Sequence, residues 1–300
     1  CRPVYERAEE IFEIGGLLTE ALFYEKLETR KVRCRLCPTE CLIAEGHRGA
    51  CGVRVNKDGI LYSEVYGRIT SASLDPIEKK PLYRYHPGEY IYSIGAKGCN
   101  LHCDFCQNWQ ISQSPDARLE DITPEEVISR AKSLKSFGIA YTYNEPFIWY
   151  EFVLECAKLA RKNNLENVLV TNGYVNIKPL EEMLPYIGAM NIDLKAFNKK
   201  FYTKICAGRL ESVLDVIKRA GKSCHIELTT LVIPGLNDSE KEIRDEAQWI
   251  CDNAGSETPL HLSRYFPCYK MKLPPTPLET LERAREIAME SLKYVYLGNV

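Results

Sequence analysis

The sequence contains neither a long apolar run nor a long run of like charges. Its apolar stretches are interrupted by charged residues well before the roughly 18 residues that a membrane-spanning helix needs. The formal net charge is only -2, so neither a nucleic-acid-binding patch nor a membrane-surface helix is indicated. The N-terminus also lacks the basic segment and apolar core of an export signal. We therefore expect a folded cytoplasmic protein with no role at a membrane.

Internal repeats and low-complexity segments are also missing, which argues against a solenoid or a disordered linker. Apolar residues make up 45% of the chain and charged residues 27%, the balance of an ordinary globular protein. With 300 residues, the chain is long enough for one large α/β domain with a small extension.

Cysteine is abundant, with 13 residues. In a short secreted chain this number would indicate disulfides, but here seven of the cysteines form two compact groups. Metal-bound thiolates are therefore the better interpretation. We expect structural roles for the others, because free cysteine commonly packs as a small buried hydrophobe. These are Cys1, Cys156, Cys206, Cys224, Cys251 and Cys268.

From about residue 90 onward, strand-like and helix-like segments alternate as in parallel βαβ units. Thr123, Pro124 and Glu126 mark one helix start by a capping box. Repeated right-handed crossovers curl such a sheet into a full or partial barrel. We predict an α/β fold with an incomplete (β/α)6 TIM-like barrel over residues 90–300 and a site at the C-terminal strand ends. The expected strands are residues 90–96, 139–143, 167–171, 190–194, 225–233, 259–263 and 294–297.

Residues 1–89 differ in character from the rest of the chain. A helix-like stretch covers residues 3–29, a cysteine-rich segment covers 34–51, and short β-like pieces follow, such as 59–66. We expect an N-terminal helical and cysteine-rich accessory module packed on the barrel.

The strongest chemical motif is a C-x3-C-x2-C segment directly after a predicted strand, formed by Cys99, Cys103 and Cys106. A [4Fe-4S] cluster has one more iron than three thiolates can hold, so one iron stays open to a non-protein ligand. The alternatives are unligated thiols or a zinc loop, although structural zinc usually takes four protein ligands and His102 could supply one. We predict a [4Fe-4S] cluster on these three cysteines, with Phe105 shielding it.

A second group consists of Cys34, Cys37, Cys41 and Cys51, spaced as C-x2-C-x3-C-x9-C. Four thiolates satisfy either tetrahedral zinc or a second iron-sulfur cluster. A pair of disulfides or free thiols is a further alternative, since some thermophilic cytosolic proteins carry disulfides. Spacing does not decide between zinc and iron.

From Tyr90 to Leu297, the order of these landmarks resembles the radical SAM superfamily. Residues 141–146 stand where that superfamily usually has a Gly-Gly-Glu segment that binds the amino group of S-adenosylmethionine. Its glycines are replaced here, so the resemblance assigns this contact to Glu145 and to the adjoining backbone with Asn144.

Two further segments, 171–173 and 193–195, resemble the T-N-G and D-L-K segments of glycyl-radical-enzyme activases such as pyruvate formate-lyase activating enzyme. This resemblance implies that S-adenosylmethionine is contacted by Thr171, Asn172, Asp193 and Lys195. From the residues alone, the first three could instead cap turns and helices. Barrels place their chemistry at the C-terminal strand ends, however, which favours cofactor contact.

Segments 34–38, 49–54, 75–82 and 106–108 resemble the AmmeMemoRadiSam-system radical SAM proteins, which are relatives of the activase, over nearly the whole chain. This family resemblance implies an oxidoreductase that reductively cleaves S-adenosylmethionine and abstracts hydrogen with a 5′-deoxyadenosyl radical.

The expected partners are a protein or peptide substrate, because an incomplete barrel leaves a wide lateral opening, and an electron donor such as flavodoxin or ferredoxin. Nucleic acid is not indicated. Two alternatives stay open. One is radical modification of a small molecule or an RNA, and the other is a non-catalytic electron carrier or redox sensor with two clusters.

Overall fold

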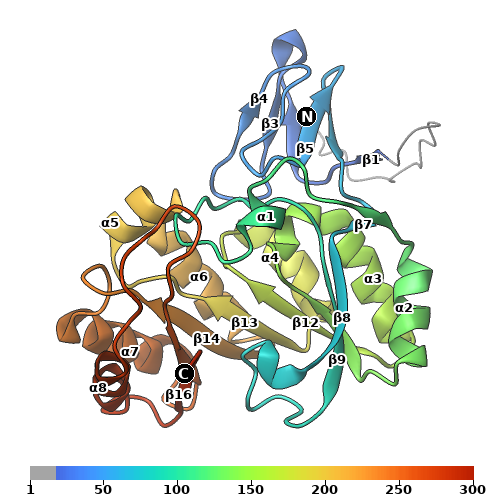
Figure 1. Cartoon of the computed structure of the whole chain (residues 1–300). Helices are drawn as coiled ribbons and strands as arrows, with labels where there is room; N and C mark the ends of the chain where they lie inside the picture. Colours follow the sequence, from blue (N-terminus) through green and yellow to red (C-terminus); the bar gives the residue numbers. More distant parts are fainter. Residues whose placement is uncertain (1–17) are drawn as a thin grey trace.

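The main body of the computed structural model, which describes residues 18–300, is an eight-stranded sheet (Figure 1). Its strand order is β16-β15-β14-β13-β12-β11-β9-β8, and all neighbouring pairs from β9 to β16 are parallel. The seven predicted strands are confirmed to within two residues at each end. The strands are β8 (Ser71–Pro76), β9 (Tyr90–Gly95), β11 (Gly138–Tyr141), β12 (Glu166–Thr171), β13 (Ala189–Asp193), β14 (His225–Val232), β15 (Leu260–Arg264) and β16 (Val295–Gly298).

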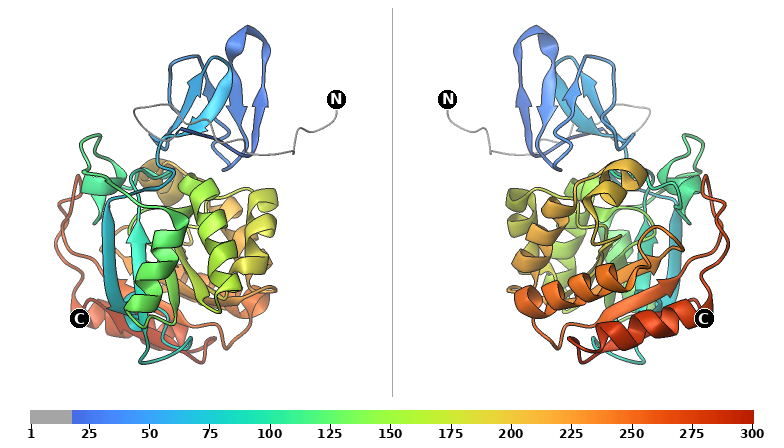
Figure 2. Two further views of the ribbon diagram at one scale, coloured as in Figure 1. Left: turned by 90° about the vertical axis from the view of Figure 1, so that its right-hand side faces the viewer. Right: turned by 90° about the vertical axis from the view of Figure 1, so that its left-hand side faces the viewer.

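Parallel strands buried on both faces read as nearly continuous apolar runs, and β11 is buried at every position. Helices connect the strands and cover the outer face of the sheet (Figure 2). The Thr123 capping box is confirmed, since Thr123 and Glu126 each accept a hydrogen bond from the other's backbone N–H. The sheet forms an incomplete barrel. Because strands β9 to β16 are parallel, their C-terminal ends lie at the same edge of the sheet. The covering helices are α2 (Pro124–Ser133), α3 (Tyr150–Lys162), α4 (Ile177–Met183), α6 (Leu210–Ala220), α7 (Glu240–Ala254) and α8 (Leu278–Ala288).

Strand β8 extends the sheet beyond the predicted barrel. It runs antiparallel to β9, with a continuous register from Ser71 opposite Gly95 to Pro76 opposite Tyr90. The sequence pattern places residues 71–76 in the accessory module, whereas the structure adds them to the barrel sheet. Apart from Asp75 its residues are not buried, so no apolar pattern marks it.

The N-terminal module consists of two small antiparallel sheets above the barrel (Figure 1). The helix predicted over residues 3–29 is wrong for residues 18–29, and residues 3–17 lie outside the described residues. The observed strands pair with segments 32–34 and 60–63, and local periodicity cannot reveal such distant partners. The sheets are β1-β6-β5 and β2-β3-β4, formed by β1 (Thr19–Glu20), β2 (Tyr24–Lys26), β3 (Val32–Cys34), β4 (Leu42–Ile43), β5 (Arg54–Lys57) and β6 (Ile60–Ser63).

Short elements complete the described chain. Within residues 18–300, no helix combines the length and the apolar character needed to cross a membrane. The short elements are β7 (Arg68–Ile69) paired with β10 (Glu120–Asp121), α1 (Trp109–Ser112), α5 (Lys199–Phe201), a π-helical turn η5 (Tyr202–Cys206), and the 3-10 turns η1 (Glu28–Arg30), η2 (Ile77–Lys79), η3 (Pro146–Trp149) and η4 (Leu184–Tyr186).

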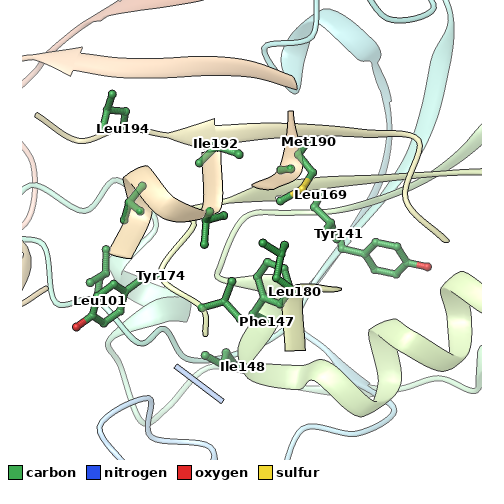
Figure 3. Close-up of a cluster of buried hydrophobic side chains, with 14 of the residues drawn as sticks. Leu101, Tyr141, Phe147, Ile148, Leu169, Tyr174, Leu180, Met190, Ile192 and Leu194 are labelled. Atoms are coloured by element: carbon green, nitrogen blue, oxygen red, sulfur yellow. The ribbon is translucent and has the colours of Figure 1, made fainter. Parts of the chain in front are cut away.

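The hydrophobic core reaches into the loop that carries the three-cysteine motif. Leu101 is 1% exposed and lies beside Tyr174 (Figure 3). A methyl group added at Gly208 would come within 2.6 Å of the Leu101 side chain. Tight packing therefore anchors the cysteine loop to the barrel.

Candidate functional site

A cavity of about 470 Å³ lies at the C-terminal ends of the parallel strands. Loops after β9, β11, β12 and β13 contribute to it, together with residues of β14 and β15. The structure therefore brings together nearly all residues that the sequence singles out for the cluster and S-adenosylmethionine. The lining includes Cys99, Cys103, Cys106, Asn144, Glu145, Asn172, Asp193 and Lys195.

Polar groups hold the cysteine sulfurs on one wall of the cavity. The Leu101 N–H lies 3.4 Å from Cys99 Sγ, and Asn172 Nδ2 lies 3.5 Å from the same sulfur. Ser112 Oγ is 3.1 Å from Cys106 Sγ. Burial raises the pKa of both thiols, so the thiolate forms need a bound cation to offset desolvation. This donor set fits an iron-sulfur cluster.

Two further cysteines, Cys206 and Cys268, contact residues of the three-cysteine motif. A hydrogen bond with Cys206, followed by burial, raises the pKa of Cys103. Cys206 is fully buried in η5 and is not among the residues that line the cavity. Cys268 Sγ donates to the Cys106 carbonyl across 3.5 Å. Sequence spacing gave no signal for either contact, because both residues lie far along the chain.

Glu145 is a buried carboxylate of the cavity that three hydrogen bonds hold in place. Its side chain accepts hydrogen bonds from Phe147 N at 3.0 Å, Thr171 Oγ1 at 2.8 Å and Asn172 N at 2.8 Å. Burial nevertheless raises its pKa to about 7. Thr171 thus lies behind Glu145 and is not among the lining residues. A cation entering the cavity would stabilise the Glu145 carboxylate.

Two asparagines fix the cysteine loop to the strand ends. Asn144 Oδ1 accepts from Ala96 N at 3.0 Å, and its Nδ2 donates to the Gly98 carbonyl at 3.1 Å. Asn172 Nδ2 donates to Asn100 Oδ1 at 3.0 Å. The loop position is therefore set from β11 and β12.

A further pair of charged residues also lines the cavity, where Lys195 Nζ lies 2.6 Å from Asp193 Oδ2. Burial opposes the charge on Lys195, but Asp193 and then Cys103 raise its pKa above the usual value. Lys195 therefore stays a cation that faces both a carboxylate and a cysteine.

Sequence reasoning missed the contribution of the β8–β9 connection. Lys79 and Lys80 line the cavity. Lys80 is 2% exposed, and its Nζ lies 2.7 Å from Asp75 and 4.6 Å from the ring centroid of Tyr143. The cluster of charged residues at 75–80 is the sequence feature that could have indicated Lys79 and Lys80. Its sequence alone does not reveal that the segment folds back along β9.

The second cysteine group gathers around one buried space in the N-terminal module. Cys34, Cys37, Cys41 and Cys51 line this space. All twelve cysteines within residues 18–300 are free, so the predicted disulfide alternative is not formed there. In the same residues, no three potential ligands converge at the spacing of a single bound metal ion.

Comparisons with known proteins place this site in context. The Radical SAM superfamily model matches residues 93–247. Uncharacterized protein MJ0808 of Methanocaldococcus jannaschii is 46% identical over 288 residues, which cover 94% of this chain and 86% of that protein. Pyruvate formate-lyase 1-activating enzyme of Escherichia coli strain K12 is 23% identical over 210 residues, which cover 64% of this chain and 85% of that enzyme.

A solved structure shares the fold. The radical SAM methyltransferase from Sphaerobacter thermophilus superposes with a TM-score of 0.56 at 14% identity, covering 71% of this chain and 67% of that one. The superfamily uses a [4Fe-4S] cluster and S-adenosylmethionine. The family match spans more than half of the described fold, including the three-cysteine motif and the ends of β11, β12 and β13 that line the cavity. The chain belongs to the radical SAM superfamily.

Proposed function

We propose that this chain is an enzyme that holds a [4Fe-4S] cluster on Cys99, Cys103 and Cys106 and cleaves S-adenosylmethionine reductively. The observation that carries the proposal is the single cavity that brings three thiols together with Glu145 and the Asp193–Lys195 pair. Three thiolates leave one iron open for the amino acid end of S-adenosylmethionine. The cofactors supply an electron and a 5′-deoxyadenosyl radical that abstracts hydrogen from the substrate.

In this proposal, residues of the chain bind and orient S-adenosylmethionine and shield the cluster from water. Glu145, with a pKa raised to about 7 by burial, gains stabilisation from the ammonium group of S-adenosylmethionine. Asp193 and Lys195, held together at 2.6 Å, offer an acceptor and a cation to the rest of the cofactor. Phe105 is 4% exposed and packs against Phe201 with ring centroids 5.8 Å apart, which keeps water from the cysteine wall.

For the substrate, the proposal is a protein or peptide. The sheet order ends at β8 on one side and at β16 on the other, which supports lateral access to the cavity. Several relatives are named activating enzymes, including that of pyruvate formate-lyase. We further propose a cytoplasmic location and a flavodoxin or ferredoxin as the electron donor.

The test is formation of 5′-deoxyadenosine by the anaerobically reconstituted protein under dithionite. We expect product from the wild type and background levels from Cys103→Ala, because removing one thiolate detaches the cluster. Cys251→Ala is the matched control, since it removes a partly buried thiol from α7. An iron-loaded wild type that forms no product would contradict the proposal and favour an electron carrier.

A further inference from the structure

The two cysteine groups lie against each other although they are far apart in sequence. An added methyl group at Gly98 would come within 2.5 Å of the Cys51 carbonyl oxygen. Gly98 directly precedes Cys99. The backbone that ends the four-cysteine group therefore touches the backbone that begins the three-cysteine group.

Asn100 provides a second contact between the groups. It is 2% exposed and lines the four-cysteine space, where its side chain works against the burial that raises the pKa of Cys37. Its Oδ1 accepts from Asn172 Nδ2 at 3.0 Å, and the same Nδ2 lies 3.5 Å from Cys99 Sγ. Asn100 therefore lies between the four-cysteine space and the amide that contacts Cys99.

Arg54 indicates what the four-cysteine space holds. It is 1% exposed and lines that space. Its Nη2 donates to Leu22 O at 2.7 Å and to Glu151 Oε1 at 2.9 Å. Within residues 18–300, Nε and Nη1 have no hydrogen-bond partner although both are buried. Buried guanidinium N–H groups require acceptors, and the thiolates and sulfides of a bound cluster would supply them.

We propose that Cys34, Cys37, Cys41 and Cys51 hold a second iron-sulfur cluster, which relays electrons through Asn100 to the cluster on Cys99, Cys103 and Cys106. Four thiolates suffice for such a cluster, and the Ala50 N–H that points at Cys41 Sγ from 3.3 Å stabilises one of them. The relay rests on the proposed function, whereas the second cluster does not.

The proposed relay transfers one electron from the donor to S-adenosylmethionine. One electron leaves a donor of the flavodoxin or ferredoxin class, which is oxidised by one unit, and passes by way of the four-cysteine group to the three-cysteine group. There it breaks the bond between sulfur and C5′ of S-adenosylmethionine, giving methionine and the 5′-deoxyadenosyl radical. The clusters that the two cysteine groups would hold return to their starting oxidation states, and the relay moves no proton.

A variant that lacks the first cluster tests the second. In Cys99→Ala/Cys103→Ala/Cys106→Ala, we expect about four irons per chain with matching sulfide if the second cluster is of the four-iron type, and an electron paramagnetic resonance signal after reduction. Zinc in place of iron, or neither metal in the folded variant, would overturn the proposal. In the fully reduced wild type, the electron paramagnetic resonance signals of the two clusters should broaden each other. Unbroadened signals would show that the two clusters do not lie close together.

The relay is tested by comparing two reductants in the wild type and in Cys37→Ser/Cys41→Ser. With reduced flavodoxin, we expect the variant to form 5′-deoxyadenosine at least about tenfold more slowly, while with dithionite its rate changes less than about twofold. Equal loss with both reductants, or no loss with either, would overturn the relay. If the wild type forms no product with either reductant, the proposed function fails, whereas the metal content of the triple-alanine variant still decides the second cluster.

Discussion

Glu145 shows how one buried carboxylate organises the cavity. It receives hydrogen bonds from Thr171 and Asn172 at the end of β12, and it also accepts from the Phe147 N–H in η3. Its burial makes ionisation costly, so the same residue that positions the strand ends is poised to attract a cation.

For Glu145, the pKa of about 7 in the folded state exceeds the ordinary value of 4.5. The folded state therefore keeps a proton that the unfolded state has lost, and the stability from this group is fully present below pH 4.5 and is lost as the pH rises through about 7. Glu145→Gln removes this dependence, which amounts to at most about 1.4 kcal/mol per pH unit.

The measurement is urea unfolding of both metal-free proteins across this pH range under reducing conditions. We expect the free energy of unfolding of the wild type to fall relative to that of Glu145→Gln as the pH rises. Parallel curves would show that Glu145 ionises normally.

Residues whose chemistry lies in local spacing are predictable from sequence, and those defined by distant contacts are not. Cys99, Cys103 and Cys106 are predicted from their spacing, and Glu145 from the resemblance of residues 141–146 to a segment of the radical SAM superfamily. Arg54 pairs with Glu151, 97 positions away, and Lys80 meets Tyr143 only because β8 folds back onto β9. Such partners follow from the strand pairing, which local sequence leaves undetermined.

Strand β14 fixes the β8–β9 connection through Glu227. This fully buried carboxylate accepts from Tyr83 N at 3.0 Å and Arg84 N at 2.7 Å, and it contacts His261 at 2.7 Å and His225 at 3.0 Å. Burial alone would raise its pKa, but these hydrogen bonds lower it to about 2. The same connection carries Lys79 and Lys80 to the cavity.

We expect Glu227→Gln to destabilise the fold by about 2–4 kcal/mol at pH 7, because buried donors lose a charged acceptor. The folded pKa is depressed, so this contribution is present above pH 4.5 and is lost as the pH falls towards about 2. Urea unfolding at pH 7 and pH 3.5 checks both points. Glu257→Gln, which alters an exposed ion pair, is the control. A destabilisation that is equal at both pH values would contradict the ionic account.

At the scale of the whole molecule, one buried ion pair joins the N-terminal module to the barrel. Arg54 in β5 lies 2.9 Å from Glu151 in α3, and their side chains are 1% and 6% exposed. Because removing one partner leaves an uncompensated buried charge, we expect Arg54→Gln to cost about 3–5 kcal/mol.

The double variant Arg54→Gln/Glu151→Gln should be more stable than Arg54→Gln, since it buries no unpaired charge. Urea unfolding of the metal-free wild type, both single variants and the double variant gives the coupling energy. Additive effects would show that the module is not joined to the barrel through this pair.

The contact between Gly98 and Cys51 also has an evolutionary consequence. Gly98 has a φ of +91° and faces the Cys51 carbonyl. Any larger residue there would strain the backbone and push the N-terminal module away from the barrel. A glycine at this position therefore meets two separate requirements, the backbone angle and the close approach of the Cys51 carbonyl. Loss of the four-cysteine segment would remove only the steric requirement at Gly98, because the φ of +91° disfavours a side chain there whatever the surroundings.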